Sequence, residues 1–166
     1  MNFELSSKAL GQLAGDKTDI LVVLVPDGFK PDRGGLSELI GDALKSEALE
    51  TKAGKTLSMW RMPGVAAQRL VLTGIGEGSA TQVRTGVAAA MAIVKASAAK
   101  HLTLCFAGTS GAQAVRAAAL AVAEGSYAYT TTKSRPEARK LKDVVIGAQG
   151  TDVAEALRHA RALVSG

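Results

Sequence analysis

Two kinds of hydrophobic pattern alternate along this chain. Residues 18–28, "TDILVVLVPDG", form a continuous apolar run that ends at Pro26 and Gly28. A run of this length and composition predicts a strand that is buried on both faces. Residues 32–50 instead carry apolar residues at helical spacing, which predicts an amphipathic helix. The residues of that spacing are Leu36, Leu39, Ile40, Leu44 and Ala48.

The same two patterns account for the rest of the chain. Further strands are predicted at residues 55–64, 69–76, 101–108 and 142–148. Further helices are predicted after Ser79 or Thr81, at residues 109–129 and at residues 151–164. Either hydroxyl side chain can cap the first of these helices by accepting a hydrogen bond from a free amide of its first turn. One face of that helix is formed by Val83, Val87, Met91 and Val94.

The order of elements is therefore β-α-β-β-α-β-α-β-α. Strands that alternate with helices predict an α/β fold with three layers, α/β/α, in which helices cover both faces of a largely parallel, mixed sheet. The length of 166 residues suits one domain, so we expect residues 1–166 to fold as a single unit. The alanine-rich helices suit close packing on a sheet, because small side chains lose little rotamer entropy.

Few residues suggest catalysis or metal binding. The chain holds one cysteine and two histidines, so an intramolecular disulfide and a cysteine metal cluster are both excluded. Cys105 lies in the apolar segment "LTLCF", where a thiol is expected to be inert core. Neither His101 nor His159 has a second ligand at metal spacing, and no pair of aspartates forms an acid/base couple. We predict no catalytic residue and no metal ligand.

Charge and hydropathy suggest where the protein works. No basic segment followed by an apolar segment opens the chain, and the longest apolar runs are shorter than the ~20 residues of a membrane span. A cytoplasmic protein without membrane contact is predicted. The net charge is +5, and the basic residues of one segment are candidate DNA contacts, although a solvated linker is the simpler explanation of them. They are Lys133, Arg135, Arg139, Lys140 and Lys142.

Two glycine-rich turns follow predicted strands, and both are candidate anion-binding sites. Backbone amides at a helix N-terminus attract phosphate. The alternative is that the glycines only permit positive φ angles in tight turns. Glu77 lies inside the first turn, where a carboxylate would repel a phosphate. The candidate residues are Gly74, Gly76, Gly78 and Ser79 in the first turn, and Gly108, Thr109, Ser110 and Gly111 in the second.

Several segments in order resemble the N-terminal domain of the leucyl aminopeptidases, including bacterial aminopeptidase A. The matching segments are "MNFEL", "DILVVLV", "GKTLSMWRMPGVAAQRLVLTGIGEG", "LTLCFAG", "AEGSYAYTTTKS", "LKDVVIG" and "EALRHARALVSG". Tyr127 and the pair Lys133-Ser134 lie in one of the more telling of them. The resemblance runs nearly from end to end.

The resemblance implies a role without catalysis for this chain. Enzymes of this family remove N-terminal residues, preferably leucine, with two divalent metals, zinc or manganese. Their metal ligands lie in a C-terminal domain around a motif like NTDAEGRL, which is absent here. The resemblance therefore implies an inactive N-terminal domain without a cofactor of its own. Its partners would be its own catalytic domain and the other subunits of a homo-hexamer.

Two alternatives follow from the same resemblance. The family's N-terminal domain is similar to the macro domain, which in other proteins binds ADP-ribose, so the chain could be a free-standing nucleotide-binding domain. Some bacterial members of the family bind DNA, so it could be a DNA-binding module. The first alternative predicts stabilisation by ADP-ribose, and the second predicts binding that weakens with salt.

Overall fold

The computed structural model describes residues 2–6, 10–31, 35–108, 111–131 and 141–147. The six strands and four helices of the described residues alternate along the chain, except that β4 follows directly after β3. In chain order they are β1 (Asn2–Ser6), α1 (Leu10–Ala14), β2 (Ile20–Val25), α2 (Gly35–Lys45), β3 (Thr56–Trp60), β4 (Arg69–Gly74), α3 (Ala80–Ala96), β5 (His101–Phe106), α4 (Ala112–Thr131) and β6 (Asp143–Gly147). None of these helices is long and apolar enough to cross a membrane.

The strands form one mixed sheet in the order β1-β6-β5-β2-β4-β3. Every neighbouring pair is parallel except β3 and β4, which are antiparallel. The strand β2 lies in the centre, and all six of its residues are buried. Its even-numbered side chains belong to the core on one face and its odd-numbered side chains to the core on the other. This explains why its sequence is apolar throughout rather than alternating.

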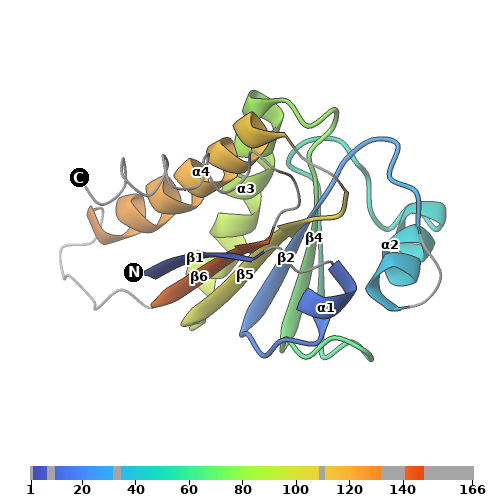
Figure 1. Cartoon of the computed structure of the whole chain (residues 1–166), viewed down its shortest axis with the longest axis horizontal. Helices are drawn as coiled ribbons and strands as arrows, with labels where there is room; N and C mark the ends of the chain where they lie inside the picture. Colours follow the sequence, from blue (N-terminus) through green and yellow to red (C-terminus); the bar gives the residue numbers. More distant parts are fainter. Residues whose placement is uncertain (1, 7–9, 32–34, 109–110, 132–140, 148–166) are drawn as a thin grey trace.

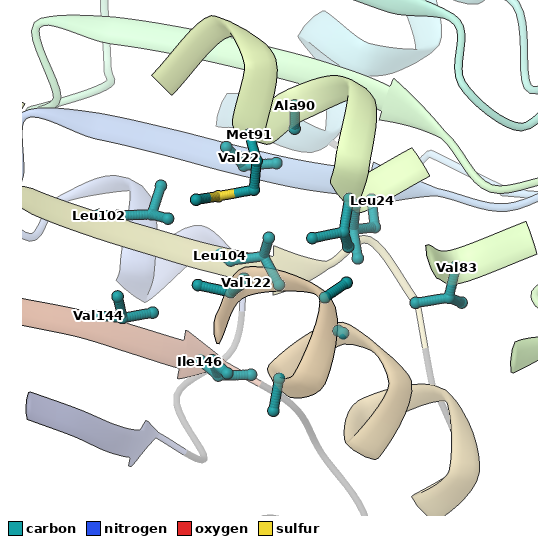
Figure 2. Close-up of a cluster of buried hydrophobic side chains, with 14 of the residues drawn as sticks. Val22, Leu24, Val83, Ala90, Met91, Leu102, Leu104, Val122, Val144 and Ile146 are labelled. Carbon is teal, nitrogen blue, oxygen red and sulfur yellow. The ribbon is translucent and has the colours of Figure 1, made fainter. Parts of the chain in front are cut away.

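Helices cover both faces of the sheet (Figure 1). The pair α3 and α4 packs on one face, where Val22, Leu24, Leu104 and Ile146 meet the helix residues Met91 and Val122 (Figure 2). The helices α1 and α2 lie over the opposite face, on a smaller core around Leu21, Val23, Leu36 and Ile40. Burial of these side chains on both faces is the main stabilising contribution of the fold.

The predicted fold class is confirmed. The strands and helices expected within the described residues are present, and Val83, Val87, Met91 and Val94 form the buried face of α3 as predicted. One detail of the α2 pattern is wrong, because the helix ends at Lys45 and Ala48 is exposed beyond it. The elements β1 and α1 were not expected at all. The helix predicted at residues 151–164 lies outside the described residues.

Candidate functional site

The carboxyl ends of the parallel strands β2, β4 and β5 meet at one edge of the sheet, where open α/β folds commonly bind ligands. The first glycine-rich turn and Gly108 of the second follow directly after β4 and β5 at this edge. Their strands are not neighbours, however, because β2 lies between β4 and β5. The connection through α3 carries the chain across β2, which the order of elements along the sequence does not reveal.

The amides of the first turn are already used within the fold. Gly74 N donates to Lys55 O at 2.8 Å, and Gly76 N donates to Thr51 O at 2.7 Å. Ile75 N continues the ladder to Val25 O at 3.1 Å, and Gly78 N closes the turn on Ile75 O at 2.9 Å. An anion bound here would compete with these bonds. Gly76 and Gly78 have φ angles of 57° and 82°, which explains why glycine occupies both positions.

A capping box closes the start of α3. The Ser79 hydroxyl accepts a hydrogen bond from Gln82 N at 3.2 Å, and Gln82 Oε1 accepts one from Ser79 N at 3.3 Å. Ser79, rather than Thr81, is therefore the N-cap. The Gln82 side chain also fills the space above Gly76, where a Cβ would collide with it. The capping box thus uses amides at this helix N-terminus that a phosphate would otherwise compete for.

The remaining candidate residues are divided between described and undescribed parts of the chain. Gly108 is exposed, and Gly111 O accepts the Val115 amide at 3.2 Å at the start of α4. Lys142 is exposed, and its amide donates to Lys100 O at 2.6 Å. The candidates Thr109, Ser110, Lys133, Arg135, Arg139 and Lys140 lie outside the described residues. Anion binding and DNA contact both stay predictions.

Cys105 and His101 both contact other parts of the fold. Cys105 is 1% exposed on β5, and burial raises the pKa of its thiol from 9.0 to about 12. His101 Nδ1 lies 2.9 Å from Asp143 Oδ2, across the parallel pair β5–β6. Asp19 Oδ2 accepts hydrogen bonds from the amides of Lys100 and His101 at 2.8 and 2.9 Å. Within the described residues, no group of three or more His, Cys, Asp or Glu residues could hold a metal ion.

A cavity of about 370 Å³ opens at the opposite, amino edge of the sheet. It lies between the starts of β2, β4 and β5, the end of β3 and the segment after α3. Its walls include Asp19, Ile20, Trp60, Arg69, Ala99 and Lys100. The sequence pattern does not indicate this cavity, because these residues are scattered over 82 positions of the chain and form no motif.

Trp60 and Arg69 form the most distinctive wall of this cavity. Trp60 is 61% exposed, and it is the one exposed large hydrophobic side chain of the described residues. The Arg69 guanidinium carbon lies 4.7 Å from the centre of the Trp60 ring, within the range of a cation–π contact. The Nε of Arg69 donates to Ser58 Oγ at 2.7 Å. The register of β3 and β4 pairs Trp60 with Arg69 and Ser58 with Val71, which brings these side chains to one face.

Comparison with known protein families and proteins shows which of them this chain is similar to. Residues 32–136 match the model of the cytosol aminopeptidase family, N-terminal domain. A relative named "Probable cytosol aminopeptidase" from Verminephrobacter eiseniae is 47% identical over 147 residues, which are 89% of this chain and 28% of the relative. Another of the same name from Polaromonas sp. is 43% identical over 172 residues, covering 100% of this chain and 34% of the relative. The chain thus spans about a third of the length of these relatives.

Solved structures share the fold at lower sequence identity. A mutant of tomato leucine aminopeptidase superposes with a TM-score of 0.72 at 20% identity, covering 99% of this chain and 36% of the other. The bottromycin maturation enzyme BotP in complex with Mn gives a TM-score of 0.57 at 21% identity, covering 89% and 30%. At this level of identity the likeness establishes the shared α/β fold.

Proposed function

The chain belongs to the cytosol aminopeptidase family, and from this membership we propose that it is the non-catalytic N-terminal domain of a longer, two-domain aminopeptidase. The observation that carries the proposal is the match of residues 32–136 to the family's N-terminal domain. The lengths of the relatives support it, because about two-thirds of each lies outside the matched region. The parent protein would remove N-terminal residues, preferably leucine, in the cytoplasm.

The two divalent metals of such an enzyme, manganese or zinc, are proposed to bind outside this chain. Two-metal hydrolysis needs a set of ligands that holds both ions about 3.5–4 Å apart. The described residues do not fit that need, because no group of three His, Cys, Asp or Glu residues comes together among them. Asp19 already accepts two backbone amides, and the Cys105 thiol is buried and protonated. The catalytic domain would supply the ligands.

Within the parent protein, this domain would support the catalytic domain and the assembly of a homo-hexamer. Contact with DNA through the basic segment is an alternative role, with Lys142 as the described member of that segment. Replacing Lys133, Arg135, Arg139 and Lys140 together by Gln should weaken binding and flatten its salt dependence. An unchanged salt slope would remove this segment from the DNA-binding role.

Hydrolysis of leucine p-nitroanilide tests whether this chain alone is catalytically inactive. We expect no release of product by the purified 166-residue chain, with or without added manganese, and clear release by the complete gene product. Activity of the short chain that survives stringent purification would overturn the proposal. In parallel, the intact mass of the natural protein and peptides mapped beyond Gly166 would test whether a catalytic domain follows.

The alternative of a free-standing nucleotide-binding domain is tested by thermal unfolding with ADP-ribose. At 100 times Kd a ligand adds about 2.7 kcal/mol to the free energy of unfolding. The amides of Gly74, Gly76 and Gly78 already donate hydrogen bonds to backbone carbonyl groups, which argues against this alternative. We therefore expect no shift at millimolar ADP-ribose.

A further inference from the structure

We propose that the cavity at the amino edge of the sheet binds a small zwitterion with an apolar side chain, a free α-amino acid. The proposal rests on the chemistry of the cavity walls and does not require the proposed function. Only the identification of this ligand with the product of an aminopeptidase rests on that function. The cavity volume of about 370 Å³ lies in the lower part of the range for small-ligand sites, about 300–1,000 Å³.

One group in the cavity suits a carboxylate. The Arg69 guanidinium is held on one side by the Trp60 ring and through Nε by Ser58. Within the described residues, its terminal NH₂ groups make no hydrogen bond or ion pair, so the fork that binds carboxylates in a bidentate manner is free. Because its orientation is already restricted, less entropy is lost when a carboxylate binds. Lys100 adds a second cation to the same walls.

Another group in the cavity suits an ammonium. Asp19 is half-buried, and its Oδ2 is held by the amides of Lys100 and His101. Among the described residues no cation lies within ion-pair distance of this carboxylate, although Arg69 and Lys100 line the same cavity. Its Oδ1 therefore remains able to accept a hydrogen bond from an ammonium group, and its position is fixed by the backbone.

Apolar groups line the same cavity as these charges. Ile20 and Ala99 are 2% and 7% exposed, so they form a buried floor, while Trp60 forms an exposed wall. A single exposed tryptophan would need no explanation by itself. Here it borders a cavity that also contains separate cationic and anionic groups. An apolar side chain that covers the Trp60 ring would remove water from both surfaces. The three requirements together describe an amino acid such as leucine.

Trp60 makes the site directly measurable, because it is the only tryptophan of the chain. The test follows Trp60 fluorescence and calorimetric heat while leucine is added to the 166-residue chain. Three analogues separate the contributions: 4-methylpentanoate lacks the ammonium, isopentylamine lacks the carboxylate, and leucinamide neutralises the carboxylate. We expect leucine to bind with a Kd on the order of 1 mM and each analogue to bind about tenfold more weakly or worse.

Variants that each remove one charge test which cavity residue binds the carboxylate of the ligand and which binds its ammonium group. Arg69→Gln should weaken the binding of leucine about tenfold and change the binding of isopentylamine by less than about twofold. Asp19→Asn should weaken the binding of leucine about tenfold and leave the binding of 4-methylpentanoate unchanged. Arg84→Gln is the matched control, because it removes an exposed cation that pairs with Glu124 on the helices and lies outside the cavity. It should bind leucine like the original chain. Ser58→Ala tests positioning of Arg69 and should weaken leucine while leaving isopentylamine unchanged.

Several outcomes would overturn the proposal. The first is the absence of both heat and fluorescence change at roughly 20 mM leucine, about twenty times the expected Kd. Equal affinities for leucine and 4-methylpentanoate would show a simple anion site. A similar loss in Arg84→Gln and Arg69→Gln would show general charge attraction. None of these results bears on leucine p-nitroanilide hydrolysis by the complete protein, so the two proposals fail separately.

Discussion

At the carboxyl edge of the sheet, the amides of Gly74, Gly76 and Gly78 all donate to carbonyl groups of the chain itself. At the amino edge, Arg69 and Asp19 line an open cavity, and within the described part of the chain the terminal NH₂ groups of Arg69 and Oδ1 of Asp19 have no hydrogen-bond partner. Fold-level analogy favours the first edge as the binding edge, because ligands of open α/β sheets gather at the carboxyl ends of strands. The available hydrogen-bonding groups favour the second.

This difference shows what a glycine-rich turn does and does not indicate. The turn after β4 needs glycine for backbone geometry, and the chain then uses the turn's amides to bind the segment around Thr51 and Lys55. A motif of this kind predicts a tight turn reliably, but whether its donors are free depends on distant segments. Groups that suit a ligand can therefore gather where the sequence shows no motif.

The largest expected effect concerns chemical access to each edge. Burial raises the pKa of Cys105 from 9.0 to about 12, so at pH 8 the folded thiol should react with iodoacetamide about 1,000-fold more slowly than the unfolded thiol. Because the folded pKa is the higher one, the neutral thiol adds stability below pH 9, and this contribution is lost as the pH rises through 12.

The matched variant places a thiol at the amino edge. Ala98 is exposed and lines the cavity, so Ala98→Cys in a Cys105→Ala background should react at the rate of a free thiol. Labelling is followed by mass spectrometry with and without urea. Rapid labelling of Cys105 in the folded chain would contradict the closed packing beneath the carboxyl edge.

Gly74→Ala tests the close packing of the carboxyl edge. A Cβ at this position would lie 2.5–2.6 Å from the carbonyl oxygens of Lys52 and Glu50 and from Thr51 C, which belong to the backbone and cannot rotate away. We expect a loss of about 3 kcal/mol in the free energy of unfolding, measured in urea. Gly11→Ala is the control, since nothing lies within 4 Å of a Cβ there and the exposed site is helical. It should be neutral or stabilise by up to about 1 kcal/mol.

Most of the fold could be predicted from the sequence, because its strongest signals are local. The apolar run of β2 and the periodic valines of α3 report their own burial. The strand β1 was missed because its polar residues Asn2, Glu4 and Ser6 interrupt the apolar pattern and it pairs only with β6, about 140 residues further along the chain. A pairing over such a distance leaves little trace in the five residues themselves.

The amino-edge cavity could not be predicted for a related reason. Asp19 meets Lys100 only because β2 lies beside β5, and Trp60 meets Arg69 only because β3 and β4 pair in one antiparallel register. The sequence predicted the strands but not their lateral order. By contrast, the Ser79 cap was one of two residues expected, because a capping box is confined to four successive positions.

Ser79→Ala should have a smaller effect than Gly74→Ala. It removes the hydroxyl that accepts the Gln82 amide at 3.2 Å, and the expected cost is about 1 kcal/mol of unfolding free energy. Thr81→Ala is the natural control, because Thr81 was the other predicted cap and is exposed one residue inside the helix. It should change stability by less than about 0.5 kcal/mol. Equal losses for the two variants would mean that the capping box contributes nothing.

Lys100→Gln should have the smallest effect on stability and gives the sharpest contrast between the edges. The Lys100 side chain is exposed and has no ion pair among the described residues. The Lys100 amide donates to Asp19, and the Lys100 carbonyl accepts the amides of Lys142 and Asp143. The substitution leaves these backbone bonds unaffected. The free energy of unfolding in urea should therefore change by less than about 0.5 kcal/mol. The affinity for leucine should fall severalfold, because the ligand carboxylate loses a cation. A stability loss above about 1 kcal/mol would mean that this edge, too, uses its charged groups to hold the fold. The two edges would then no longer differ in kind, and the cavity would not offer a ligand a free cation at Lys100.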